Sequence, residues 1–201
     1  PAAEAVREVM AEELVPPESL EEREVEAWRE AELEKRYRRT ALNGDFGRIL
    51  CIGYLKEGPS GMSEGVLTGE EAPILRQFWE MARDVDKFIG HNVLDFDLKF
   101  IWKRSVVHSV KPSIYVSFAR FRSDFVYDIM HEWEKWGREY ISLGRLARVL
   151  GLPSTKGELD GSKVFDYYRE GRLQEIYEYC LADVRLVREI YNRMTFTEEN
   201  K

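Results

Sequence analysis

A tyrosine and an aspartate stand four residues apart in the last long helical segment of the chain. Tyr179 and Asp183 fall on one helical face, in the same stripe as Ile176, Val187 and Ile190. Burying a carboxylate among apolar side chains is costly unless the carboxylate is paired or binds a metal ion. The stripe therefore predicts either a metal ligand at Asp183 or an aspartate at its solvated edge, with Tyr179 filling the core.

A second candidate carboxylate follows a short apolar segment in the middle of the chain. The sequence GHNVLDFDLKF, residues 90–100, leads from a predicted strand through Asn92 to Phe96 and Asp97, in the first turn of a predicted helix. Ligand-binding groups of α/β proteins lie at the carboxyl ends of strands, which favours a ligand-binding role for the Asp97 carboxylate. Both Asp95 and Asp97 could instead only stabilise the helix N-terminus. For Asp95 we adopt this simpler interpretation.

Apolar strands and amphipathic helices surround both segments. The predicted strands are residues 47–55, 62–68, 87–93 and 125–130, and the predicted helices are residues 70–85, 96–107, 142–150 and 166–194. The first two strands form a hairpin, and the later strands alternate with helices. This order predicts an α/β domain with a mixed sheet.

The N-terminal part of the chain differs in composition from the rest. The 201 residues are enough for one sizeable core, and 37 acidic against 30 basic residues give a net charge of −7. Much of this excess lies in residues 1–40, which predict an acidic arm of two helices separated at Pro16 and Pro17. The arm is expected to belong to the same domain as residues 41–201.

Several classes of protein are excluded by the sequence. No apolar run reaches the about 18 residues that span a bilayer, and no signal peptide opens the chain. We therefore expect a soluble, cytoplasmic protein without membrane contact. Cys51 and Cys180 are far apart and lie in different types of segment, so they predict buried small hydrophobes rather than a disulfide or a metal site.

The two carboxylate segments resemble motifs of a known family. NVLDFD, residues 92–97, resembles the second exonuclease motif of DEDDy-type 3′–5′ exonucleases, and YCLAD, residues 179–183, resembles the third. Together with YDIM, residues 127–130, and GLPSTKGELDGSKV, residues 151–164, they make roughly residues 40–195 similar to predicted 3′–5′ exonucleases related to the proofreading domain of family B DNA polymerases. The resemblance implies a ribonuclease H-like mixed sheet flanked by helices, with the arm at its N-terminus.

The resemblance also implies a metal-dependent reaction. Phosphodiester hydrolysis in such enzymes uses two divalent cations about 4 Å apart, here Mg²⁺ or Mn²⁺. Asp97 and Asp183 would bind these metals, and Tyr179 would orient the attacking water. The related histidine-bearing type has its general base five residues before the last aspartate, where this chain has Glu178, so Tyr179 supports the tyrosine type.

The first motif of the family, an acidic pair on the first strand, has no counterpart in the sequence. Acidic pairs do occur in the arm, at the end of a predicted helix and after a predicted strand, but none lies on a strand. We therefore expect the sequence to begin just after this motif, and residues 41–201 to form an exonuclease domain without its first strand. Two carboxylates alone would hold metal poorly, so little activity is expected without that strand.

The expected substrate is the 3′ end of single-stranded DNA or RNA. Residues 98–123 contain six basic residues and no acidic one, including Lys99, Lys103 and Arg104, which could contact phosphates. Interleaved aromatic residues could stack on bases, although core packing is the preferred role of Trp102 and Phe118. The resemblance places Phe96 near the terminal nucleotide and Asn92 near its sugar or phosphate.

A polar, glycine-containing loop before the last helix adds one further candidate. Lys156 lies in this loop and either reaches the substrate or is an ordinary solvated lysine.

Two other functions remain open on the same sequence. The fold could serve as a nucleic-acid-binding module that has lost catalysis, which the absence of an upstream acidic pair would favour. Alternatively, the acidic arm could dock a protein partner, whereas a buried apolar stripe on the arm would indicate packing within the chain.

Overall fold

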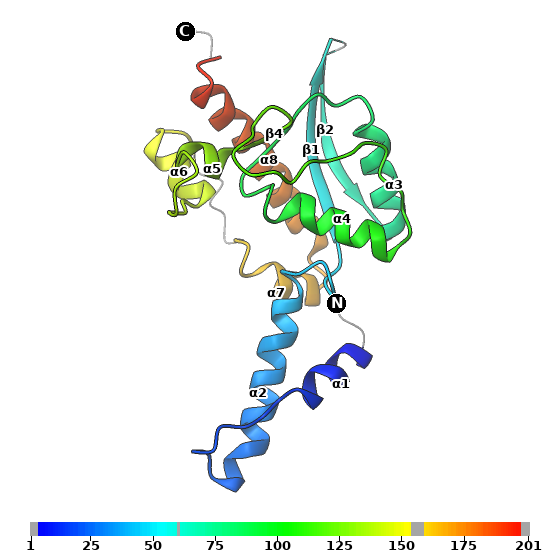
Figure 1. The fold of residues 1–201 in the computed structure, drawn as a ribbon, viewed down its shortest axis with the longest axis vertical. Helices are drawn as coiled ribbons and strands as arrows, with labels where there is room; N and C mark the ends of the chain where they lie inside the picture. The colour runs from blue at the N-terminus through cyan, green and yellow to red at the C-terminus, as the bar shows by residue number, and fades with distance from the viewer. Residues whose placement is uncertain (1–3, 60, 154–158, 198–201) are drawn as a thin grey trace. The chain divides into compact units, whose positions relative to one another are not determined.

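The structure is a computed structural model that describes residues 4–59, 61–153 and 159–197 (Figure 1). It divides the chain into two compact units, Pro1–Ile49 and Leu50–Lys201. Within the described ranges, no helix is both long enough and apolar enough to cross a membrane.

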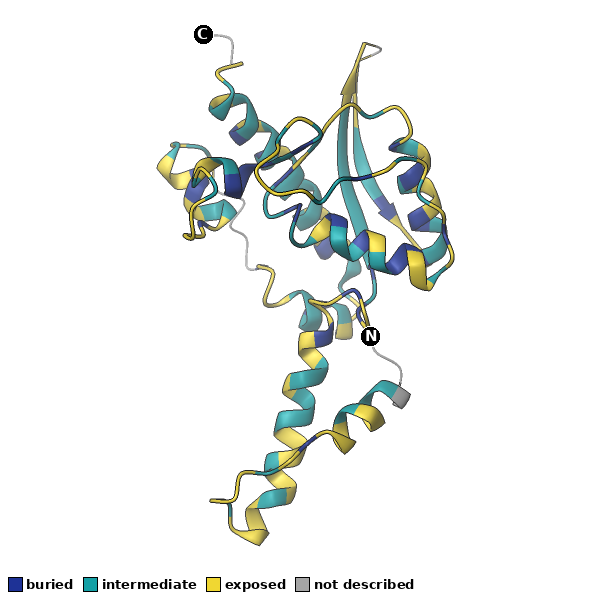
Figure 2. Cartoon of the chain, viewed as in Figure 1, coloured by how far each residue is buried: buried dark blue, intermediate teal, exposed yellow. Residues whose placement is uncertain are grey.

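The first unit contains the two helices predicted for the acidic arm. They are α1, Glu4–Glu12, and α2, Glu22–Thr40, and the segment between them contains the two prolines. Arg7 of α1 donates a hydrogen bond of 2.8 Å to Glu34 of α2. Most described residues of this unit are exposed or half-buried, and Thr40 is the one buried residue of α2 (Figure 2). The contact between the helices therefore includes polar groups, and α2 has no buried apolar stripe.

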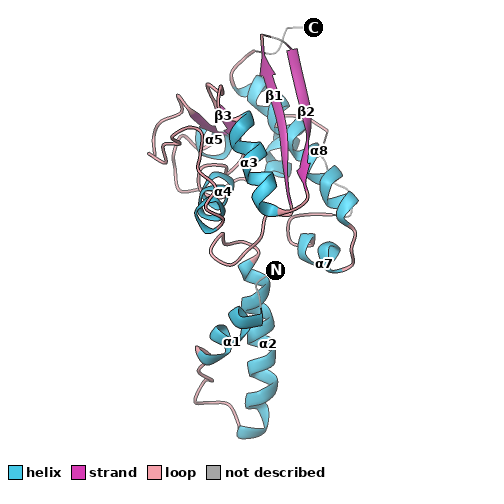
Figure 3. Ribbon diagram, turned by 90° about the vertical axis from the view of Figure 1, so that its right-hand side faces the viewer, coloured by secondary structure: helices cyan, strands magenta, loops and turns pink. Residues whose placement is uncertain are grey.

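The second unit contains two small sheets. Strands β1, Cys51–Gly58, and β2, Gly61–Thr68, form the predicted antiparallel hairpin. Strands β3, Phe88–Gly90, and β4, Val126–Asp128, pair in parallel (Figure 3). The α/β class is confirmed, but the described strands form two small sheets rather than one mixed sheet, because no described strand hydrogen-bonds to both pairs.

Helices follow the strands along the second unit. They are α3, Glu71–Met81; α4, Asp97–Val107; α5, Ile129–Trp133; α6, Leu143–Val149; α7, Val164–Arg169; and α8, Leu173–Met194. A single helix over residues 166–194 is a wrong prediction, because Gly171 adopts a left-handed φ of 75° between α7 and α8. Glycine is the residue that accepts this conformation at least cost.

Helix α8 connects the two sheets. It packs against β1 and β2 of one sheet and against β3 of the other. Farther along α8, Leu186 and Ile190 join Ile129 and Leu146 in a buried apolar cluster. These contacts fix the helix that carries Tyr179 and Asp183 relative to the strands.

Candidate active site

The segment that leads to Asp97 is held by a buried carboxylate. Asp128, at the end of β4, accepts hydrogen bonds of 3.0 Å from the backbone N–H groups of Asn92 and Leu94. The same side chain accepts a hydrogen bond of 3.1 Å from the N–H of Met130 and so caps α5. Asp128 is fully buried. It therefore ties the β3–α4 connection to the end of the neighbouring strand, and α4 begins at Asp97.

The backbone of this connection needs particular residues. A Cβ atom on Gly90 would lie 2.5 Å from the Cβ of Val93, a distance that real Cβ atoms do not adopt. Two residues later, Asn92 has a φ of 58°, a left-handed conformation that asparagine accepts more readily than most residues. The sequence Gly-His-Asn thus allows the chain to turn sharply from β3 towards α4.

Tyr179 and Asp183 share one face of α8, as their spacing predicts. The two side chains are hydrogen-bonded, and the phenol is the donor because the carboxylate has only acceptor atoms when ionised. Burial raises the pKa of Tyr179 above its usual value, and the charge of Asp183 and this hydrogen bond raise it further. The phenol therefore stays protonated at neutral pH and can donate a hydrogen bond.

The charges of Asp97 and Asp183 both act on one side chain of α8, Cys180. The pKa of the Cys180 thiol is lowered, mainly by its hydrogen bond with Cys51, while burial and the negative charges of Asp97 and Asp183 oppose this shift. Both carboxylates therefore lie close enough for their charges to act on this sulfur. Burial, which disfavours the charged form, raises the pKa of Asp97 to about 7, and the negative charge of Asp128 contributes to this rise. The Asp97 residue nevertheless retains an exposed surface. A cation could therefore reach this carboxylate.

The carboxylates fit a divalent metal in kind but not in number. Mg²⁺ and Mn²⁺ prefer oxygen ligands, and carboxylate oxygens are what Asp97 and Asp183 offer. Across the described ranges, however, no group of three or more His, Cys, Asp or Glu side chains is placed to hold a metal ion. Two cations would therefore need ligands beyond these two side chains.

The candidate substrate-binding residues have different environments. Lys99 is half-buried and forms an ion pair of 2.5 Å with Asp95. Lys103 is also half-buried, one turn farther along α4. Phe96 packs against Phe100 with ring centroids 5.9 Å apart. For Asn92, the structure records the bond from its backbone N–H to Asp128.

The basic stretch does not contribute all its charges to the surface. The prediction that Arg104 contacts phosphates does not fit the structure, because Arg104 is buried and forms two hydrogen bonds of 2.8 Å with Glu71. His108 lies in the same cluster, 2.7 Å from Glu71. Lys156 lies outside the described residues.

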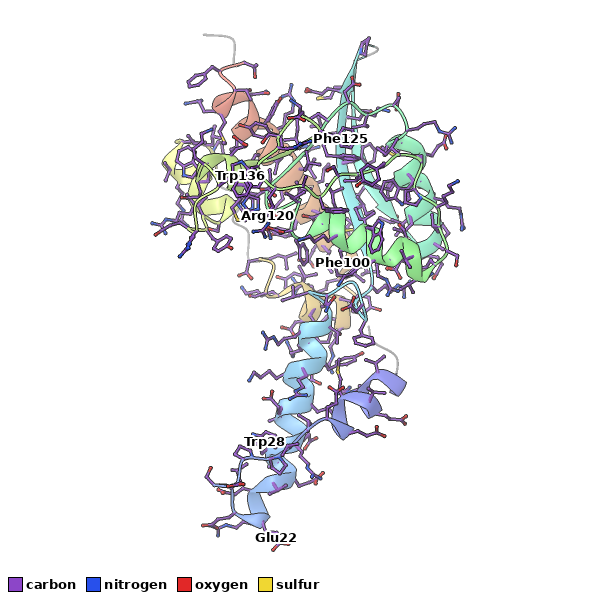
Figure 4. The ribbon with its side chains drawn as sticks, in the orientation of Figure 1. Glu22, Trp28, Phe100, Arg120, Phe125 and Trp136 are labelled. Atoms are coloured by element: carbon purple, nitrogen blue, oxygen red, sulfur yellow. The ribbon has the colours of Figure 1, made fainter. Side chains whose placement is uncertain are left out.

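An aromatic stack lies beside Asp95. His131 stacks on Trp136 with an interplanar angle of 3°, and Phe121 packs against Trp136 from 5.2 Å. Asp95 is 2.9 Å from His131 and 3.4 Å from Arg120. Figure 4 labels Arg120 and Trp136, which lie on two neighbouring segments of this unit. Asp95 therefore links the start of α4 to both segments. The sequence predicted only an effect of Asp95 on the helix N-terminus.

Two aromatic residues test the core-packing interpretation. Trp102 is 49% exposed, so the prediction that it fills the core is wrong. Its position on α4 follows buried Ile101, and consecutive helical residues point in different directions. Phe118 is half-buried.

Asp128 and the contact between Cys51 and Cys180 were not predicted from the sequence. Asp128 follows an apolar strand and precedes a helix, a position typical of an N-cap, which was an available signal. The contact between Cys51 and Cys180 had no such signal, because the chain brings the two residues together only through the packing of α8 on β1.

The second unit is thus an α/β unit in which Asp97 begins α4 and Tyr179 and Asp183 share one face of α8. A family model for predicted 3′–5′ exonucleases related to the exonuclease domain of PolB matches residues 60–200. The chain therefore belongs to this family, and the recognition made from residues 92–97 and 179–183 is confirmed. The family supports a hydrolase of the nuclease class. No curated protein and no solved structure matches the chain.

Proposed function

We propose that this protein is a metal-dependent 3′–5′ exonuclease with a ribonuclease H-like fold, which removes nucleotides from the 3′ ends of single-stranded DNA or RNA. The observation that carries the proposal is that Asp97 and Asp183 both lie close enough to Cys180 for their charges to act on its thiol, with Tyr179 hydrogen-bonded to Asp183. Membership of a family of predicted exonucleases supports the same reaction.

Each residue of the site has a separate task in this proposal. Two divalent cations would supply an attacking hydroxide and neutralise the charge that develops on the leaving oxygen. Asp97 and Asp183 would hold the cations. The protonated phenol of Tyr179 would orient the attacking water, while its bond to Asp183 limits the rotation of the ring. The substrate would lie along α4, where Lys99, Lys103 and Phe96 remain candidate contacts.

Further carboxylates would come from an additional strand. Among the described strands, β1 pairs only with β2 and β3 pairs only with β4, while α8 packs on both pairs. Unpaired strand edges are open to hydrogen bonding by another extended segment. We propose that such a segment, carrying two acidic residues, joins the two pairs in the active protein.

A digestion experiment tests this function. Single-stranded DNA and RNA carrying a 5′ label are incubated with the full natural protein and Mg²⁺ or Mn²⁺. Progressive shortening from the 3′ end is expected with the natural protein and with Glu189→Gln, an exposed control position on α8. The Asp183→Asn variant should lose this activity, because it removes one proposed metal ligand. Equal shortening by Asp183→Asn and the natural protein would contradict the proposal.

The second candidate is a nucleic-acid-binding module without catalysis. It is favoured by one observation, that no third metal-binding side chain joins Asp97 and Asp183 in the described part of the chain. Binding of a labelled single strand that is never shortened, with the same affinity in Asp183→Asn, would identify this function instead.

A further inference from the structure

Two cysteines meet beside the carboxylates of the candidate active site. Cys51 is the first residue of β1, and Cys180 lies on α8 three positions before Asp183. Their side chains are hydrogen-bonded to each other. Both are free thiols, and both are half-buried rather than fully buried as the sequence predicts. Each sulfur therefore has a second sulfur as its neighbour.

Gly53 explains how α8 comes so close to β1. Residues two apart on a strand face the same side, so Cys51 and Gly53 point to one face of β1. A Cβ on Gly53 would lie 2.8 Å from the sulfur of Cys180 and 3.2 Å from its carbonyl oxygen. The missing side chain therefore leaves the space that the Cys180 sulfur occupies, on the same face as Cys51.

Apolar packing holds the two elements together at this point. Cys51 packs against a small buried cluster that includes Tyr167 and Ile176, and Tyr179 packs against the same cluster. Ile176 lies one turn before Cys180 on α8. This packing fixes the strand end and the helix relative to each other next to the thiol pair. The two sulfurs are therefore held close together, so joining them needs little movement of the backbone.

We propose that Cys51 and Cys180 are a modification site, an oxidisable thiol pair that peroxide converts to an intramolecular disulfide between β1 and α8. Hydrogen peroxide first oxidises one thiol to a sulfenic acid and releases one water. The other thiol attacks the sulfenic sulfur, so the S–S bond forms, the S–O bond breaks and a second water leaves. Two electrons pass from the two sulfurs to the peroxide oxygens. This proposal does not depend on nuclease activity.

The test is a peptide map of the full chain after treatment with hydrogen peroxide. Remaining thiols are alkylated, the protein is digested without reductant, and the peptides are identified by mass spectrometry. The expected product is one linked peptide pair that contains Cys51 and Cys180, and dithiothreitol should separate it. The crosslink should also raise the melting temperature by about 5 °C or more, because it closes a long loop. Cys51→Ser and Cys180→Ser should each remove both effects.

Three results would overturn the proposal. These are intact thiols under peroxide concentrations that oxidise free glutathione completely, sulfinic acid on either cysteine without a linked pair, or disulfides found only between separate chains. The peptide map of the natural protein decides among them even if a serine variant fails to fold.

Discussion

Replacing Asp128 with alanine would test how the segment before Asp97 is held in place. The fully buried carboxylate of Asp128 accepts hydrogen bonds from the backbone N–H groups of Asn92, Leu94 and Met130 at 3.0 to 3.1 Å. A buried donor that loses its acceptor costs about 1–3 kcal/mol. The bonds from Leu94 and Met130 are buried, and the bond from Asn92 is only partly buried, so water can replace part of it.

We therefore expect Asp128→Ala to lower the free energy of unfolding by about 4 kcal/mol. Asp128→Asn keeps one acceptor oxygen but turns an NH₂ group towards one of the N–H groups, so its loss should be about 2 kcal/mol. Urea unfolding followed by circular dichroism measures both values. Asp124→Ala, at an exposed aspartate before β4, is the control and should change stability by less than about 0.5 kcal/mol.

One result would refute this reasoning about the buried carboxylate. A loss below about 1 kcal/mol for Asp128→Ala would mean that the backbone donors find other partners without it. The β3–α4 connection would then not depend on Asp128.

Three further predictions concern packing, protonation and a buried ion pair. Gly53→Ala should destabilise the fold by about 1–3 kcal/mol, because the added methyl group meets the Cys180 sulfur, and thermal unfolding measures the loss. The contribution of Asp97 to stability should fall as pH rises from about 4 to 7, because Asp97 keeps its proton in the folded state up to a pKa of about 7 and loses it earlier when unfolded. Asp97→Asn should lack this decline, a difference of about 1 kcal/mol after allowance for the exposure of the side chain, measured as urea midpoints across this pH range. Arg104→Ala should cost about 3–5 kcal/mol because buried Glu71 loses its two hydrogen bonds from the guanidinium. Adding Glu71→Gln should recover part of that loss, and no recovery in the double variant would contradict the ion-pair explanation.

Local patterns in the sequence were sufficient for several elements. The two prolines predicted the separation of α1 and α2, and the glycine-rich turn after Cys51–Gly58 predicted the hairpin with β2. The four-residue spacing of Tyr179 and Asp183 predicted their shared face. These features depend on residues that lie close together in the sequence, so local patterns are enough to predict them.

Long-range packing was less accessible from the sequence. The helical period continues across Gly171, and an isolated glycine is tolerated inside helices, so the break between α7 and α8 was not predicted. The basic character of Arg104 indicated a phosphate contact, yet its partner Glu71 lies on a different helix. The meeting of Cys51 and Cys180 likewise depends on how α8 packs on β1, which no local pattern encodes.

The most direct measurement of the central claim is Mn²⁺ binding to the full natural protein, followed by electron paramagnetic resonance. If Asp97 and Asp183 hold the catalytic metals, Asp97→Asn and Asp183→Asn should each weaken binding at least about tenfold, since removing a ligand or its close support typically costs this much. Glu189→Gln should leave binding unchanged. Unchanged affinity in both aspartate variants would contradict the assignment of these two residues as metal ligands.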